Sequence, residues 1–221
     1  MLGDWCAIEP FCPGSSDGCL KDPGWTSGDA TSAFYFVKDL EVMVQMAHAT
    51  GKSSDATKYH AALEHARTSY HTAFFNASTD DFGPTQTGNA LGILASPHVE
   101  PGAVRQLLTN IHQRNGHLST GAVGSRWILQ ALTAANQTEA ALELAAQKTG
   151  PSWFWFSEHG PGTLHENWPK GKIPDGTTSG SLNHPMFGGV KFLASIGVWC
   201  SVLLSNSLFI ILILYHGLFV F

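Results

Sequence analysis

Apolar residues recur at helical spacing along most of this chain. From Ala30 to Gly51 they follow the i, i+3, i+4 spacing of an amphipathic helix, and Gly51 suits the position just after a helix end. The same spacing predicts a second helix that runs to about Asn76, with Ser53 or Ser54 as its N-cap. Two helices joined by so short a turn form an antiparallel helical hairpin.

The pattern then repeats towards the C-terminus. It predicts four more helices, at residues 86–94, 102–114, 121–135 and 138–148, with Pro101 near the start of the second. Residues 30–150 contain no alternation of apolar and polar residues long enough for a useful strand. The predicted fold class is therefore all-α, built of hairpins with functional loops at one end.

Three parts of the chain differ in character. Residues 1–29 are rich in Gly, Pro, Cys and Asp and are predicted to form an N-terminal loop. Residues 30–190 form the helical domain, and its last part, residues 150–190, is dense in Gly, Pro, Trp and His. A long loop inside a compact domain is usually functional when it is too aromatic to be disordered. We therefore expect the active site in residues 150–190.

The third part is an apolar tail at residues 191–221. After Lys191 the chain has no Lys, Arg, Asp or Glu, and this stretch exceeds the about 20 apolar residues that span a bilayer. Three interpretations stay open: a transmembrane anchor, a helix buried by further protein, or translated non-coding sequence. Membrane association is therefore undecided, and sequons at Asn76 and Asn136 favour the secretory pathway.

The amino-acid composition limits the classes of function that the chain can have. A formal net charge of −5 offers no basic surface for nucleic acid. Seven Trp and thirteen Phe suit a cleft that binds carbohydrate, although they suit an aromatic core almost as well. The four cysteines lack the short Cys-x2-Cys clamp, and no His-Glu-x-x-His occurs, so neither a metal site nor a cofactor is predicted.

Glu166 is the first candidate for catalysis. It lies beside Trp168 in a loop rich in aromatic residues, where an apolar surrounding tunes the pKa of a carboxyl group. Glycoside hydrolysis uses such a carboxyl group as acid or base at the scissile bond. The alternatives are that Glu166 caps a helix or pairs with Lys170.

Further candidates could contact a sugar. Asn183 and His184 precede a proline that holds the backbone extended, so both side chains could bond to hydroxyl groups, or His184 could simply stabilise the loop. Asp4 and Trp5 could form the lip of a cleft. Trp153 belongs to an aromatic cluster of a kind that more often forms part of a core.

Taken together, these segments resemble the catalytic domain of the α-L-rhamnosidases of glycoside hydrolase family 78. The resemblance covers about residues 1–190 and is carried by the order of its motifs. These are Gly3-Asp4-Trp5, Thr31 to Tyr35, Gln86-Thr87-x-x-Ala90-Leu91, Gly116-His117-Leu118-Ser119-Thr120-Gly121, Pro151-Ser152-Trp153, Gly162-x-Leu164-x-Glu166-x-Trp168 and Ser181-x-Asn183-His184.

The resemblance implies part of an (α/α)6 toroid, about half of its six hairpins. It implies an inverting hydrolase that releases terminal α-L-rhamnose from oligosaccharides or glycosides. Glu166 would be the general base, and Asp4, Trp5, Trp168 and His184 would line the sugar pocket. The two carboxyl groups of an inverting pair lie roughly 6.5–9.5 Å apart.

Two departures from the family pattern affect these expectations. His165 stands where the family usually has Trp before the base, and the Arg-Asp-Glu-like motif of the general acid is absent. We therefore expect a fragment that exposes apolar surface, is poorly soluble and is inactive on its own. The alternatives are a non-catalytic or vestigial sugar-binding protein, another (α/α)6 hydrolase, and a membrane-anchored interaction module.

Overall fold

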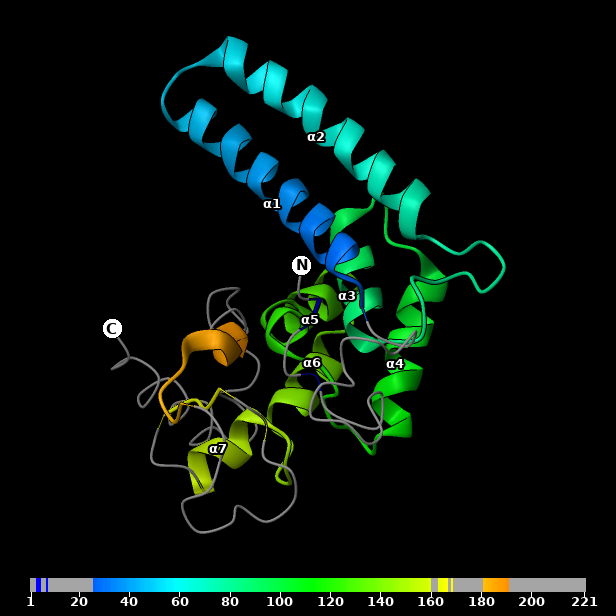
Figure 1. The fold of residues 1–221 in the computed structure, drawn as a ribbon, viewed down its shortest axis with the longest axis vertical. Helices are drawn as coiled ribbons and strands as arrows, with labels where there is room; N and C mark the ends of the chain where they lie inside the picture. The colour runs from blue at the N-terminus through cyan, green and yellow to red at the C-terminus, as the bar shows by residue number, and fades with distance from the viewer. Residues whose placement is uncertain are drawn as a thin grey trace.

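The chain folds as a set of helical hairpins. The computed structural model describes residues 3, 4, 7, 26–159, 163–166, 168 and 181–190. Within these residues there is no β-strand, and only an isolated bridge joins Asn76 to Asp81. The helices are α1 (Gly28–Ala49), α2 (Ser53–Phe74), α3 (Gln86–Ala95), α4 (Pro101–Gln113), α5 (Ala122–Ala134), α6 (Thr138–Ala145), α7 (Trp153–His159) and the 3-10 helix η2 (Pro185–Val190) (Figure 1). The all-α prediction is confirmed.

The first six helices are arranged in an inner and an outer row. Helices α1, α3 and α5 each pack against the helix that follows, and α3 also packs against both α1 and α5. Helix α3 is the centre of this arrangement, because all of its residues except Leu94 are buried. Three hairpins with neighbouring inner helices are what half of an (α/α)6 toroid requires.

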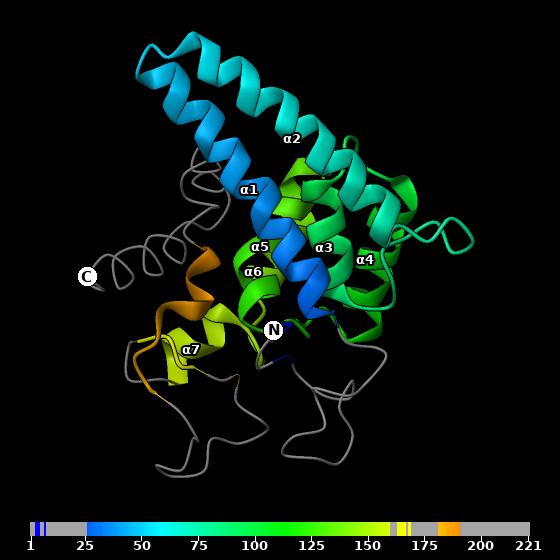
Figure 2. The ribbon, with the colours of Figure 1, turned by 45° about the horizontal axis from the view of Figure 1, so that its top comes forward.

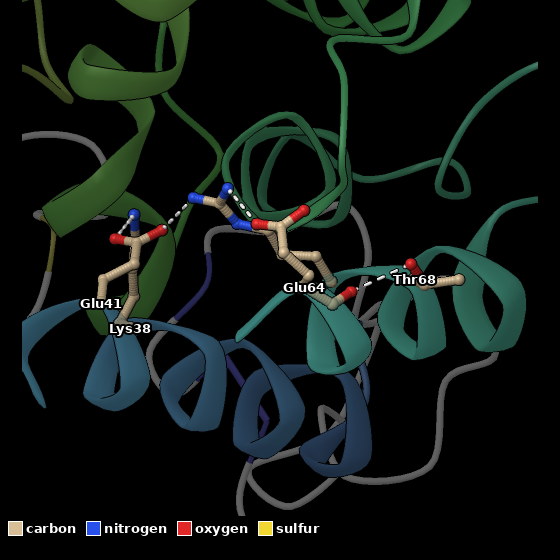
Figure 3. Close-up of polar contacts among 5 residues, drawn as sticks. Lys38, Glu41, Glu64 and Thr68 are labelled. Atoms are coloured by element: carbon tan, nitrogen blue, oxygen red, sulfur yellow. Dashed lines mark hydrogen bonds and ion pairs between the residues drawn. The ribbon is translucent and has the colours of Figure 1, made fainter. Parts of the chain in front are cut away.

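The α1–α2 hairpin is the longest, and it extends away from the other helices (Figure 2). Phe34, Val37 and Leu63 belong to its buried side. Its two helices are also joined by charge: Arg67 on α2 lies 2.9 Å from Glu41 on α1, which lies 2.8 Å from Lys38 (Figure 3). Packing and a small ion-pair network therefore hold the hairpin together.

An apolar stripe on α1 remains in contact with solvent. It consists of Tyr35, Phe36, Val42, Met43 and Met46, which are all exposed. This is the kind of apolar surface that the sequence led us to expect. Within the described residues, none of the helices has the length and apolar character needed to span a bilayer.

Three details differ from the sequence predictions. Helix α6 ends at Ala145, before the predicted end at residue 148. Lys52, not Ser53 or Ser54, is the N-cap of α2, and it makes no side-chain cap bond. Residues 150–190 also contain more helix than expected, because α7 and η2 form there. Their aromatic residues Phe156 and Phe187 pack with the buried Trp168, and this burial outweighs the weak helix propensity of the segment.

Candidate active site

The predicted catalytic loop consists of two paired segments, residues 163–166 and 181–184. The backbone N–H of Glu166 donates to the carbonyl of Ser181 at 2.9 Å. The N–H of His184 donates to the carbonyl of Leu164 at 2.8 Å, and the Thr163 hydroxyl donates to the carbonyl of Leu182. These bonds bring two motifs that are well separated in the sequence side by side.

Glu166 is held at this pairing by both its backbone and its side chain. Its Oε2 accepts a hydrogen bond of 2.8 Å from the N–H of Ser181. Its Oε1 has no hydrogen-bond partner among the described residues, and the residue is half-buried. Among the described residues the carboxylate is therefore held through one oxygen only.

His184 and Asn183 lie on the opposite segment. The Nδ1 of His184 accepts from the N–H of Met186 at 3.2 Å, so the neutral ring carries its proton on Nε2. The backbone of Asn183 is tied to the Ser181 hydroxyl by two bonds of 3.1 Å, and the residue is exposed. Both side chains are therefore set on an anchored backbone next to Glu166.

Asp4 has a different environment from the one expected of a sugar contact. It is only 1% exposed, and its carboxylate accepts from the Thr87 hydroxyl and from three backbone N–H groups at the start of α5. The three donors are Gly121 at 2.7 Å, Val123 at 2.9 Å and Gly124 at 3.0 Å.

This arrangement makes Asp4 the cap of a helix distant in sequence. The N-cap residue of α5, Gly121, has no side chain and cannot cap the helix itself. Burial raises the pKa of the Asp4 carboxyl above its ordinary 3.8, and the bonds from Thr87, Gly124, Gly121 and Val123 oppose that rise.

Trp168 and Trp153 belong to an aromatic cluster inside the protein, in which both are buried. The ring of Trp168 stacks on Phe187 at 4.2 Å and on Phe156 at 5.0 Å, and its Nε1 donates to Thr120 at 2.9 Å. The Nε1 of Trp153 donates to the carbonyl of Phe187 at 2.6 Å. Both rings are therefore packed into the core next to η2.

His165 also points into this cluster. Its ring lies 4.8 Å from Phe156, and the residue is 3% exposed. Neither ring nitrogen has a hydrogen-bond partner among the described residues, and burial lowers the pKa of the imidazole. His165 is therefore part of the buried cluster, next to Glu166 in the sequence, and not part of an exposed surface.

The sequence analysis gives Gln86 and Thr87 only as members of a motif, and the structure shows their contacts. The Gln86 side chain, which is fully buried, accepts from the N–H of Ser119 at 2.8 Å and donates to the carbonyl of His117 at 3.0 Å. Thr87 binds Asp4. The motifs around residues 4, 86 and 120 are therefore parts of one hydrogen-bonded unit, and only their common order in the sequence signalled it. Trp5 lies outside the described residues.

The family comparison covers this entire arrangement. The model of the bacterial α-L-rhamnosidase 6 hairpin glycosidase domain matches residues 1–195. An α-L-rhamnosidase of Formosa agariphila is 27% identical over 86% of this chain, and one of Streptomyces avermitilis is 30% identical over 79%. This chain spans only 20% and 17% of these two relatives, about a fifth of their length.

Solved structures agree with the sequence comparison. The crystal structure of the Streptomyces avermitilis α-L-rhamnosidase complexed with L-rhamnose superposes with a TM-score of 0.69 and 27% identity. The superposition covers 87% of this chain and 18% of that chain. The chain belongs to the bacterial α-L-rhamnosidase six-hairpin glycosidase domain family.

Proposed function

We propose that this chain carries the general-base side of an α-L-rhamnosidase active site, with Glu166 as the base. The relatives named above are α-L-rhamnosidases, and one of them was solved with L-rhamnose bound. The observation that carries the proposal is the setting of Glu166, whose carboxylate is anchored, among the described residues, by Ser181 through Oε2 only. This supports a role in which Oε1 receives a proton.

In the proposed reaction, Glu166 removes a proton from a water molecule that attacks the anomeric carbon. The bond between that carbon and the leaving group breaks on the opposite face of the sugar, so the configuration inverts. The Nε2–H of His184 and the amide of Asn183 are proposed to donate to sugar hydroxyl groups, because both side chains are carried on the segment paired with Glu166.

Asp4, Trp153 and Trp168 are proposed to act as positioning residues. Asp4 fixes the first turn of α5, and Thr120 in front of that turn accepts from Trp168. Trp168 and Trp153 contact Phe187, which lies three residues after His184. Through these contacts both segments of the loop are tied to the same end of the inner helices.

A complete inverting site also needs a general acid, which protonates the leaving group and contributes about 10²- to 10⁴-fold to the rate. The family's acid motif does not occur in the sequence. We therefore propose that the isolated chain does not hydrolyse ordinary rhamnosides. A substrate whose leaving group departs without a proton needs only the base.

α-L-Rhamnosyl fluoride is such a substrate, because fluoride leaves as an anion. The experiment incubates the purified 221-residue chain, kept soluble with a mild non-ionic detergent, with this fluoride and separately with an alkyl α-L-rhamnoside, whose leaving alkoxide needs a proton. We expect hydrolysis of the fluoride above the spontaneous rate and none of the alkyl glycoside. Proton NMR should show β-L-rhamnose as the first product.

Other outcomes would point elsewhere. Release of α-L-rhamnose first would contradict the inverting mechanism. Hydrolysis of the alkyl glycoside would show that a general acid is present after all. Binding of L-rhamnose without any hydrolysis of the fluoride would support a non-catalytic sugar-binding protein.

A further inference from the structure

Two histidines and a glutamate meet outside the candidate active site, at a corner between α2 and α4. His71 lies in the last turn of α2, His98 lies in the connection between α3 and α4, and Glu100 is the N-cap residue of α4. The Oε1 of Glu100 lies 2.7 Å from the Nε2 of His71 and 2.8 Å from the Nε2 of His98. The three potential ligand atoms all lie within 4.8 Å of one another.

The orientation of Glu100 does not follow from helix capping. At an N-cap position a side chain normally accepts from the first backbone N–H groups of its helix, but Glu100 makes no such bond. Its carboxylate is turned towards the two imidazoles, and its side chain is only 12% exposed. A carboxylate held in this way is preorganised as a ligand.

The two imidazoles differ in how firmly they are held. The ring of His71 stacks on Phe75 at 4.5 Å and meets Phe82 edge-on at 6.0 Å. The side chain of His98 is 67% exposed, and its ring lies 5.6 Å from that of His71. One histidine is therefore fixed by packing, and the other is free to adjust its position.

We propose that His71, His98 and Glu100 form a binding site for a divalent transition metal ion, with Zn²⁺ the best match. Two imidazole nitrogens and one carboxylate oxygen are a known three-ligand set for zinc, with water in the fourth position. Calcium and magnesium prefer ligand sets made only of oxygen and are poor matches. Metal–ligand bonds of about 2.0–2.2 Å place tetrahedral ligand atoms roughly 3.3 Å apart. Both N···O separations need to widen by about half an ångström, which takes a movement of the exposed His98 and a rotation of the Glu100 carboxylate away from the packed His71.

A metal at this position would cross-link α2 to the start of α4. These are the outer helices of two neighbouring hairpins. Among the larger helix contacts of the described residues, both helices pack against α3 and not directly against each other. Binding of an ion to the folded state alone would raise the unfolding temperature in proportion to the logarithm of its concentration.

Zinc titration of the purified 221-residue chain tests the proposal, with the four cysteines alkylated in every sample so that thiolates do not bind the ion. At micromolar concentrations the wild-type chain should bind one equivalent of Zn²⁺ more than His98→Ala or Glu100→Gln. If these variants still bind that equivalent, their affinity for it should be at least about tenfold lower. His65→Ala is the matched control, because His65 is an exposed histidine on the same helix as His71.

Thermal unfolding gives a second measurement on the same samples. Zn²⁺ should raise the unfolding temperature of the wild type and His65→Ala, and a chelator should reverse the shift. His98→Ala should show a smaller shift or none, and because the side chain of His98 is largely exposed the fold of the variant should persist by circular dichroism. Equal zinc affinity in the wild type and both site variants, or no binding by the wild type, would overturn the proposal.

Discussion

Replacement of Asp4 tests whether this residue caps α5. In Asp4→Ala the three N–H groups of Gly121, Val123 and Gly124 lose their carboxylate acceptor, as does the Thr87 hydroxyl. Loss of an N-cap costs about 0.5–2 kcal/mol, and each buried donor left without a partner costs about 1–3 kcal/mol. Water can take the place of some of the lost hydrogen-bond acceptors, so we expect the free energy of unfolding to fall by about 3–5 kcal/mol.

Asp4→Asn should have a smaller effect of the same sign. One oxygen remains as an acceptor, while the amide NH2 faces N–H donors that it cannot bond, so we expect a loss of about 1–3 kcal/mol. The control is Asp39→Asn on α1, because Asp39 is exposed and its change should alter stability by less than about 0.5 kcal/mol.

The assay is urea unfolding followed by far-ultraviolet circular dichroism, with all variants in the same detergent. The reasoning is refuted if Asp4→Ala is as stable as Asp39→Asn. A variant with unchanged stability but weaker binding of L-rhamnose would instead place Asp4 in contact with the sugar, as the family resemblance implies.

Two further predictions concern His165, next to Glu166, and Gly189 in η2. Burial lowers the pKa of His165 below 6.5, so the unfolded state binds more protons between the two pKa values, and stability should fall as the pH drops below about 7. His165→Phe removes two ring nitrogens that have no hydrogen-bond partner among the described residues. It should stabilise the chain by about 1–2 kcal/mol at neutral pH and by more near pH 5.5. Equal gains at the two pH values, measured by urea unfolding, would contradict this. A Cβ at Gly189 would lie 2.4 Å from the carbonyl oxygen of Ser125, whereas one at Gly188 would meet nothing within 4 Å. Gly189→Ala should therefore cost about 1–3 kcal/mol and Gly188→Ala much less, and similar unfolding midpoints for the two variants would show that η2 does not pack on α5 as described.

The helices could be predicted from the sequence because their signals are local. The apolar spacing that ends at Gly51 predicted α1 to within two residues at each end, and Gly51 has the left-handed φ of 70° typical of that position. Pro101 is the first residue of α4, as its fixed φ favours. Each of these features depends on residues within one or two turns of helix.

The site could be predicted only in part, because its contacts join distant residues. The importance of Glu166 and His184 followed from their motifs, but the backbone pairing that brings them together depends on tertiary structure. The sequence analysis led us to expect a sugar contact at Asp4. Its bonds to the start of α5 could not be predicted, because no local signal shows that Gly121, far along the chain, provides no side-chain cap. His71, His98 and Glu100 escaped notice for the same reason, since residues 72–97 separate the first two.

The central claim is that Glu166 acts as a general base, and one rate comparison tests it most directly. The wild-type chain, Glu166→Gln and the control Glu158→Gln, an exposed carboxylate on α7, are compared on α-L-rhamnosyl fluoride. The account predicts that Glu158→Gln matches the wild type while Glu166→Gln is slower by about 10²-fold or more, with its free energy of unfolding unchanged within about 1 kcal/mol. Equal rates for the wild type and Glu166→Gln would contradict the assignment of Glu166 as the base.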